Sequence, residues 1–469
     1  MPTPLLILRG GSVVTPDGLV PADVHIAGGR IAALVQPGLE PPPGEIVDVE
    51  GCWIFPGVID AHVHLGKDIT APRTPEDAAL ESASAVAGGV TTMLAYLMSP
   101  QPYEEIFADA QQLMAEHSHA NFGFHFCLVT QEQLRSVGHY AKELGVSSFK
   151  LFMNFRGDEG AYLNLPGNDD SFLFDALVAM RENDSLLTPH AENIELVWRL
   201  RKQLQRDSRD GLRAWNLSRP DYAEAEALGR VCYLARTVGA SAYAVHVSSR
   251  EAFQAIERYR QEYPRLYIET CPHYLTLGED SPLGSRGKVN PPLRTLADRE
   301  FLWERVRANE IDVLASDHVP RHYTAKDKDI WSASAGFPGV GTLFPLFLSE
   351  CLKRGVSLST VARMTATRPA ELFGLGDRKG KIWVSYDADL TVVDPRRGFT
   401  IRAEDQHSGA AYSVWEGTEC SVSVRHTIIG GRFAVRDGTV LSGHRGQYVP
   451  RPASGEAALR RLTPAPGPA

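Results

Sequence analysis

The sequence predicts an α/β protein: a (β/α)8 barrel of the TIM type, with a small β-sandwich domain that the N- and C-terminal segments form together. Three observations support this prediction. The chain has 469 residues, which suits a large barrel with an accessory domain better than one small core. Its central part alternates short apolar runs with amphipathic segments, as parallel strands joined by crossover helices do. Both ends instead carry short strand-like runs separated by turn residues.

Segment boundaries follow from the places where these patterns change. We assign residues 1–54 to the first part of the sandwich, 55–378 to the barrel, 379–445 to the second part of the sandwich, and 446–469 to a flexible or oligomer-contacting tail. In the sandwich, turns such as Gly-Gly and Asp-Gly separate strands that we expect at Leu5–Arg9, Ser12–Thr15, Asp23–Ala27, Arg30–Val35, Ala388–Asp394 and Ser421–Ile429.

In the barrel, the apolar runs predict strands that end near His62, Tyr96, Val129, Lys150, His190, His246, Glu269 and Ser316. The amphipathic segments predict helices at Pro75–Ala87, Glu104–Glu116, Gln131–Leu144, Ala223–Val238 and Arg250–Tyr259. In barrels of this kind, catalytic groups gather at the carboxyl ends of the strands. Residues with metal-binding chemistry stand at several of these ends, which indicates a functional site at that rim.

Composition and charge argue against several other classes of protein. Hydrophobic residues make up 43% and charged residues 22%, which is ordinary for a globular protein. The net charge of -9, without a basic stripe, argues against a nucleic-acid partner. No apolar stretch reaches the length of a membrane span, and the run in Met1–Arg9 is too short for a secretory signal. The six cysteines form no CxxC pair, so we expect free buried thiols and a cytoplasmic location.

The segment Gly57–Gly66 contains the motif His62-Val63-His64 after an apolar run. Residues two apart on a strand point to the same face, so the two imidazoles would lie side by side. Imidazole nitrogen is a good ligand for zinc and similar divalent ions, and such a pair commonly forms half of a metal site. The alternative is a pair of surface histidines on a strand, but four further ligand-type residues downstream favour the metal site.

Lys150 lies inside the apolar run Ser147–Met153. Burial disfavours the ammonium form and lowers the pKa of a lysine, so a neutral amine becomes accessible. A neutral amine can add CO2 to form a carbamate, an anion whose two oxygens can bridge two metal ions. The alternative is a lysine at the exposed end of the strand that extends its ammonium into water. We favour the carbamate because the other candidates point to the same rim.

His190, His246 and Asp317 each follow an apolar run and begin a polar loop. Either histidine alone would more commonly be a core residue bonded to the backbone, but on adjacent strands they are better interpreted as ligands of a second metal. Asp317 could bind one ion, accept a proton from the attacking hydroxide and pass it to the leaving nitrogen. The alternatives for Asp317 are a helix cap or a loop ion pair. The adjacent His318 is expected to point to the other side.

Two metal ions would lower the pKa of a bridging water, hold it as hydroxide and polarise the carbonyl that is attacked. Amide hydrolysis needs such a nucleophile and also a proton for the departing amine. The chain has no GxSxG motif, and none of its cysteines has a sequence setting that favours covalent catalysis. The sequence therefore favours metal-dependent amide hydrolysis without a nucleophilic side chain.

The motifs around His62-Val63-His64, Lys150, His190–Asn193, His246–Ser248 and Ser316–His318 resemble the metal-site motifs of the cyclic amidohydrolases, a group that includes hydantoinases (dihydropyrimidinases), allantoinases and dihydroorotases. The resemblance spans residues 5 to 445. It implies a binuclear centre, commonly zinc, in which a carboxylated Lys150 bridges the ions. His62 and His64 would hold the more buried ion, with Asp317 beside it, and His190 and His246 the more exposed one. The family also implies homotetramers or homodimers.

The subfamily is less clear from the sequence. Glu192-Asn193 and Arg219-Pro220 resemble hydantoinases, whereas Lys288–Arg294 is closer to dihydroorotases, in which the asparagine at the position of Asn290 contacts the ring. The arginine that dihydroorotases usually carry soon after HxH is absent.

The tyrosine that hydantoinases place five residues after the lysine, to steady the oxyanion, is Phe155 here. That role is therefore empty, taken by another group or left to the metal. By resemblance, Ala335 and Gly336 contact the ring amide together with Asn290.

We therefore predict a hydrolase that opens a small cyclic amide or ureide ring of the hydantoin or dihydropyrimidine type. The alternative within the family is an allantoinase or dihydroorotase-like activity on a polar or anionic ring. The alternative from another class is a non-catalytic scaffold relative, which typically lacks several of the metal ligands that this chain retains.

Overall fold

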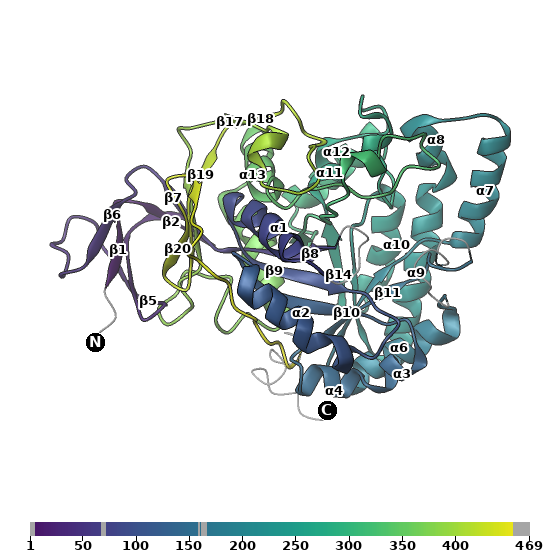
Figure 1. Ribbon diagram of the computed structural model, residues 1–469, viewed down its shortest axis with the longest axis horizontal. Helices are drawn as coiled ribbons and strands as arrows, with labels where there is room; N and C mark the ends of the chain where they lie inside the picture. The colour runs from purple at the N-terminus through teal and green to yellow at the C-terminus, as the bar shows by residue number, and fades with distance from the viewer. Residues whose placement is uncertain (1–4, 67–71, 158–159, 161–166, 454–469) are drawn as a thin grey trace.

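The computed structural model describes residues 5–66, 72–157, 160 and 167–453. Figure 1 shows two parts: a large barrel with surrounding helices, and a smaller stack of sheets near the N-terminus. Within the described part of the chain, no helix is both long and apolar enough to cross a membrane.

The barrel is one parallel sheet of eight strands in the order β15-β14-β13-β12-β11-β10-β9-β8. Its strands read as nearly continuous apolar runs because helices cover the outside and side chains fill the inside. In chain order the strands are β8 (Val58–Val63), β9 (Val90–Leu97), β10 (Asn121–Cys127), β11 (Ser148–Phe152), β12 (Leu186–His190), β13 (Ser241–Ala244), β14 (Leu266–Thr270) and β15 (Val313–Leu314).

Closure of the barrel between its first and last strands depends on the side chain of Asp60. Its Oδ1 accepts hydrogen bonds from the backbone N–H of Ser316 at 3.0 Å and of His62 at 3.2 Å. Just above, the N–H of His64 donates to the carbonyl of His318 at 2.8 Å. Because β15 is only two residues long, these contacts take the place of the regular backbone hydrogen bonds between β15 and β8, and they bring the ends of the two strands together.

Several of the helices that surround the sheet begin with recognisable capping residues. For example, Thr74 and Asp77 form a capping box at the start of α1, and the Asn193 side chain accepts a hydrogen bond from the N–H of Leu196. The longer helices are α1 (Pro75–Ala87), α2 (Tyr103–His117), α6 (Asp170–Glu182), α7 (Ile194–Arg206), α8 (Gly211–Ser218), α9 (Asp221–Val238), α10 (Arg250–Arg260), α12 (Leu296–Arg307) and α13 (Leu343–Lys353). Five-residue or six-residue helices are α3 (Gln131–Arg135), α4 (Val137–Lys142), α11 (Pro272–Thr276), α14 (Leu358–Ala362) and α15 (Arg368–Leu372).

The sandwich consists of two sheets with a common apolar core. The smaller sheet has the order β5-β4-β1-β6, and the larger has the order β21-β20-β19-β16-β7-β2-β3. The N-terminal strands are β1 (Leu6–Arg9), β2 (Ser12–Thr15), β3 (Gly18–Pro21), β4 (Asp23–Ala27), β5 (Arg30–Val35), β6 (Glu45–Asp48) and β7 (Trp53–Pro56). The C-terminal strands of this sheet are β16 (Leu390–Asp394), β19 (Ser423–Ile429), β20 (Arg432–Arg436) and β21 (Thr439–Val440), and β17 (Phe399–Thr400) pairs separately with β18 (Glu419–Cys420).

The two ends of the chain meet inside the larger sheet. Strand β7 pairs in parallel with β2 on one side and antiparallel with β16 on the other, so that Ile54 lies opposite Val392. Figure 1 shows the purple strands β2 and β7 beside the yellow strands β19 and β20 of the same sheet. Residues of both ends also share one buried cluster, in which Leu8 and Val24 lie with Leu390 and Ile428. The predicted fold class, including a sandwich made from both ends, is therefore confirmed.

Residues 446–453, which the sequence pattern assigned to the tail, are held against the barrel. The N–H of Val449 donates to the carbonyl of Phe122, and the N–H of Arg451 donates to that of Gly145. The guanidinium of Arg451 is fully buried and donates to Ser148 Oγ at 2.8 Å. These contacts lie near the amino ends of β10 and β11, opposite the rim that carries the site. The rest of the predicted tail, 454–469, lies outside the described residues.

Candidate metal centre and active site

The six predicted ligands converge at the carboxyl ends of five barrel strands. His62 lies on β8 with His64 just beyond it, Lys150 lies on β11, and His190 ends β12. The remaining two, His246 and Asp317, follow β13 and β15. All six line one cavity of about 510 Å³, and the four predicted substrate contacts, Asn290, Phe155, Ala335 and Gly336, line the same cavity.

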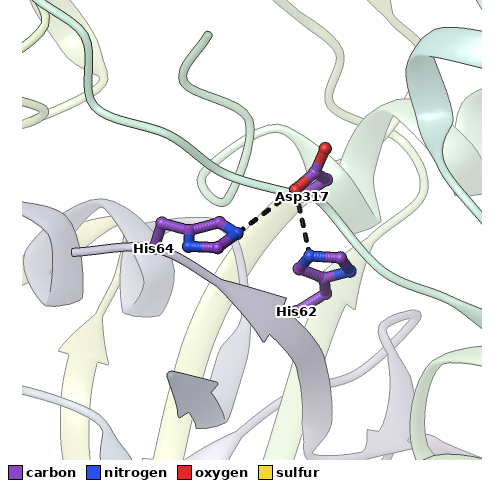
Figure 2. Close-up of side chains that lie close together, drawn as sticks. All are labelled: His62, His64 and Asp317. Carbon is purple, nitrogen blue, oxygen red and sulfur yellow. Dashed lines mark ion pairs between the residues drawn. The ribbon is translucent and has the colours of Figure 1, made fainter. Parts of the chain in front are cut away.

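One group of donors is formed by His62, His64 and Asp317, as Figure 2 shows. The Nε2 atom of His62 is 3.1 Å from Asp317 Oδ1, and the Nε2 atom of His64 is 3.7 Å from the same oxygen. Ligand atoms of all three lie within 4.8 Å of one another. Two ligands of one tetrahedral zinc ion are roughly 3.3 Å apart, given metal–ligand distances near 2 Å. The spacing of this group therefore fits a single divalent cation.

A second pair of donors lies beside the first group. The Nδ1 atom of His190 is 3.0 Å from Nε2 of His246, a spacing that also fits two ligands of one ion. Lys150 Nζ is 3.4 Å from His62 Nε2, and the rings of His62 and His246 are 5.4 Å apart. Lys150 thus contacts the first group directly, and the ring of His62 connects that group to the second pair.

The nitrogens that point away from the cavity are held by buried carboxylates. His62 Nδ1 is 2.8 Å from Glu269 Oε1, and His190 Nε2 is 2.7 Å from Glu192 Oε2. Metal-binding histidines usually donate their second ring N–H to a carboxylate or carbonyl, which fixes the tautomer and orients the ring. Glu192 is itself bonded by Arg219 Nη1 at 2.6 Å. The fixed rings leave the inward nitrogens as electron-pair donors, which is the form that binds a divalent ion.

Glu269 joins three elements at the floor of the site. Besides His62, it accepts hydrogen bonds from the N–H of His246 at 2.8 Å and from the hydroxyl of Tyr243 at 2.8 Å. Sequence reasoning did not assign this role to Glu269 or to Glu192, although Glu269 stands at a predicted strand end and Glu192 stands in a motif that carries the family resemblance. An acidic residue at a strand end beside a ligand histidine is the signal that could have identified them.

The backbone of two predicted ligands is strained. His246 has φ of 42° and Asp317 has φ of 49°, in the left-handed region that residues with a Cβ rarely adopt. Such strain persists only where surrounding contacts enforce it, and it is concentrated at functional sites. It also ends β13 and β15 before these residues, so that both side chains turn into the cavity rather than continue the strand.

Burial favours the protonation states that metal binding requires at several of the predicted ligands, whereas at His62 the carboxylates of Glu269 and Asp317 raise the pKa against the effects of burial and Lys150. Burial lowers the pKa values of His64, His190 and His246, which favours neutral imidazoles at neutral pH. It also lowers the pKa of Lys150 to about 8, against the opposing effect of Asp317, so the neutral amine is within reach. For Asp317, burial alone would raise the pKa, but the nearby imidazoles, His62 first, hold it below the usual range. Asp317 is therefore a carboxylate.

His318 points away from the donor atoms, as expected from its position next to Asp317. Its Nδ1 accepts the N–H groups of Gly339 and Val340 at 3.0 and 3.3 Å, and its Nε2 lies 3.0 Å from Glu81. These contacts fasten the loop after β15 to α1 and to the segment before α13. His318 thus supports the backbone on which Asp317 is held.

Known proteins resemble this chain along nearly its whole length. It is 30% identical over 461 residues to the D-hydantoinase of Geobacillus stearothermophilus, covering 95% of this chain and 96% of that protein. It is also 30% identical over 467 residues to a D-phenylhydantoinase of Escherichia coli O1:K1 / APEC, covering 95% and 98% of the two chains. A model of the amidohydrolase family matches residues 329–435. The chain belongs to the hydantoinase family of cyclic amidohydrolases.

Solved structures of this family share the fold. A crystal structure of D-hydantoinase superposes with a TM-score of 0.87 at 30% identity, covering 95% of this chain and 99% of the other. The dihydropyrimidinase from Brevibacillus agri NCHU1002 gives a TM-score of 0.87 at 28% identity, covering 95% and 98%. The L-hydantoinase from Arthrobacter aurescens gives 0.88 at 26% identity, covering 95% and 99%.

Within this family fold, the wall beside β11 departs from the expected pattern. Phe155 lies where a tyrosine is expected, and its ring stacks on Phe152 with centroids 4.3 Å apart. Both rings line the cavity, and neither offers a hydroxyl. Elsewhere along the cavity, Gly336 has φ of 92°, and its N–H donates to the carbonyl of Lys288 at 3.0 Å, which joins the two loops that carry Asn290 and Ala335.

Glu269→Gln should weaken metal binding by about 10- to 100-fold, as is typical for loss of a carboxylate that orients a metal-binding histidine. The amide can still donate or accept, but it no longer stabilises the His62 ring by charge. Titration of the metal-free protein with Zn2+ measures the change. Glu262→Gln, at an exposed ion pair with Arg236, is the control and should bind as the wild type does. Unchanged affinity in Glu269→Gln would mean that the His62–Glu269 contact serves only the fold.

Proposed function

We propose that this protein is a metal-dependent hydrolase that opens the C–N amide bond of a cyclic amide or ureide ring of the hydantoin or dihydropyrimidine type. The observation that carries the proposal is the convergence of four imidazoles, a buried lysine amine and a carboxylate on one cavity, with the outward nitrogens of two imidazoles held by acids. The names of the hydantoinase relatives support the substrate class.

Two divalent ions, with zinc as the first candidate, would be held by His62, His64 and Asp317 and by His190 and His246, with Lys150 as a carbamate between them. When bound, such ions polarise the carbonyl that is attacked and increase the acidity of a water molecule. The Lys150 ammonium would lose a proton, add CO2 as the neutral amine and lose a second proton, which replaces a costly buried cation with a carbamate anion beside the two donor groups.

Asp317 has the position and the protonation state of a proton carrier. Its Oδ1 lies at the centre of the first donor group, which places the carboxylate beside the atoms that react. It would accept the proton released when water adds to the ring carbonyl. It would then donate this proton to the ring nitrogen as the C–N bond breaks, so that the product leaves as a neutral amine or ureide nitrogen.

We extend the proposal to the setting of the enzyme. The substrate is a small molecule, and the net charge of -9 argues against nucleic acid as a partner. The six cysteines are free and buried, as predicted, which supports a reducing compartment such as the cytoplasm. A homotetramer or homodimer is the assembly that the family resemblance implies.

Ring opening should be measured with hydantoin, dihydrouracil, allantoin and dihydroorotate on protein of known metal content. We expect turnover of hydantoin or dihydrouracil, its loss when a chelator removes the metal, and its return when Zn2+ is added. Turnover of allantoin or dihydroorotate alone would instead indicate an allantoinase or dihydroorotase-like activity. Gently purified protein that contains no metal and takes none up would instead indicate a non-catalytic scaffold.

A further inference from the structure

A second cavity lies where both sheets of the sandwich meet the amino end of the barrel. Its volume is about 680 Å³, within the range of small-molecule sites. It is lined by the turn between β4 and β5, the turn between β19 and β20, and parts of the segment 378–389. Asn121 at the start of β10 and several residues of 444–449 complete the wall. This second cavity has no lining residue in common with the cavity of the predicted metal ligands.

Part of this wall is backbone in direct contact. The N–H of Ala388 donates to the carbonyl of Gly29 at 2.9 Å, and the N–H of Gly431 donates to the carbonyl of Ala388 at 3.0 Å. Gly29 has φ of 78°, and a Cβ added to it would lie 3.1 Å from the carbonyl oxygen of Gly430. The two turns and the segment between them are therefore fixed against one another before any ligand binds.

Four arginines line the second cavity, and within the described part of the chain none of them forms an ion pair: Arg30, Arg378, Arg432 and Arg445. Arg30 donates instead to the carbonyl of Ser385 at 3.1 Å, and Arg445 to that of Glu116 at 2.8 Å. Arg378 is half-buried and the other three are exposed, so an anion can reach them from solvent. A guanidinium is always charged, so four of them without acids are unusual in a chain of net charge -9.

The acidic residues of this lining do not neutralise the arginines. Asp387 lies 3.1 Å from Lys379 Nζ, and Asp389 contacts the same ammonium. Asp389 also accepts the N–H of Gly430 at 2.7 Å. Four guanidiniums and one ammonium thus stand against two carboxylates, both of which are already paired with the ammonium. The cavity is therefore cationic.

His444 contributes a buried polar atom to the same wall. It is 8% exposed, and its Nε2 has no hydrogen-bond partner among residues 5–66, 72–157, 160 and 167–453. Burial lowers its pKa to about 4, and the charges of Arg432 and Arg445 add to this effect, so the imidazole is neutral at pH 7. A buried polar atom without a partner costs free energy, and a ligand that supplies a partner removes this cost.

We propose that the second cavity binds a small polyanion whose phosphate or carboxylate groups are held by two or more of the four arginines. The guanidinium presents a planar fork of donors that matches either group, and charge-assisted hydrogen bonds are about twice as strong as neutral ones. Because the lining is separate from the metal-ligand cavity, this inference does not depend on the proposed ring-opening function.

Calorimetric titration of the full-length, metal-loaded protein tests the inference. Fructose 1,6-bisphosphate serves as the phosphate probe and glutarate as the carboxylate probe, so the two sources of the anionic group are distinguished. We expect saturable binding of at least one probe and none of fructose, which has no charge, at the same ionic strength. Metal content measured before and after titration should be unchanged.

Variants of the arginines locate the bound anion. Arg378→Ala and Arg432→Ala should each weaken binding by at least about 10-fold, because each removes charged hydrogen bonds to the probe. Arg432→Lys should bind more tightly than Arg432→Ala, since the ammonium keeps the charge but not the fork. Arg402→Ala is the matched control, because Arg402 forms an exposed ion pair with Glu416, and it should bind as the wild type does.

Thermal unfolding separates binding from a structural role. Neither Arg378 nor Arg432 forms an ion pair in the described structure, so both alanine variants should keep the wild-type Tm without probe. The probe should raise Tm in the wild type and in Arg402→Ala more than in these two variants. If an alanine variant unfolds, the affinity of Arg432→Lys relative to the wild type decides the question, and equal affinity would count against the site.

Three outcomes would overturn the inference. One is that neither probe binds in a saturable way. Another is binding that Arg378→Ala and Arg432→Ala leave unchanged, which would place the anion elsewhere, for example at the active-site metals. The third is a native mass that falls in Arg432→Ala while the wild type binds neither probe, which would assign the arginines to an interface between copies of the chain.

Discussion

Asp317→Asn is expected to lower kcat for ring opening by about 10²- to 10⁴-fold, the range typical of a general acid–base group. The amide has almost the same shape as the carboxylate, and its oxygen can still face His62 and His64. It cannot accept a proton from water or return one to the ring nitrogen. We therefore expect most of the bound metal to be retained while turnover is lost, which kcat and metal analysis of the same sample would show.

Asp437→Asn is the matched control, because Asp437 forms an exposed ion pair with Arg425 in the sandwich. This control should keep the wild-type rate. A wild-type rate in Asp317→Asn would remove Asp317 from proton transfer. Loss of metal in parallel with loss of rate would instead assign Asp317 to ligation alone.

Lys150→Ala should lose both metal and ring-opening activity. Without the amine no carbamate can form, and the two donor groups are left with no anion between them. Short carboxylic acids should restore part of the activity, because a carboxylate can occupy the space left by the lysine side chain and supply two similar oxygens. Metal content and kcat, each measured with and without added acetate or propionate, would show the loss and the rescue.

The exposed Lys353, which pairs with Glu350 at the end of α13, provides the control. Lys353→Ala should bind metal and turn over substrate as the wild type does, and acetate should not affect it. Full activity of Lys150→Ala without added acid would exclude the carbamate. Rescue that depends on the acid would support it directly.

The barrel could be predicted because its strands are buried on both faces and read as continuous apolar runs. Strand β12 ends at His190, as expected, whereas β13 ends at Ala244 rather than near His246. The difference arises from the left-handed backbone at His246, which nothing in the local sequence indicates. Likewise, the helix expected at 131–144 is two helices, α3 and α4, that meet at Ser136.

The six candidate ligands could be identified because their side-chain chemistry recurs at successive strand ends. The residues that support these ligands could not be identified in the same way, because their role depends on contacts that only the folded structure brings about. Glu269 meets His62 across the barrel floor, although the two are far apart in sequence. The same limit applies to Arg451, which enters the barrel base from the end of the chain.

The central place of β7 in the larger sheet has a consequence for synthesis on the ribosome. Trp53–Pro56 emerges early and can pair with Ser12–Thr15, but its other edge stays open until Leu390–Asp394 has been translated. An open apolar edge is a template for pairing with other nascent chains. The native arrangement of this domain can therefore be completed only after translation of the entire barrel. Removal of the strands of either terminus would leave the edge of a strand from the other terminus unpaired.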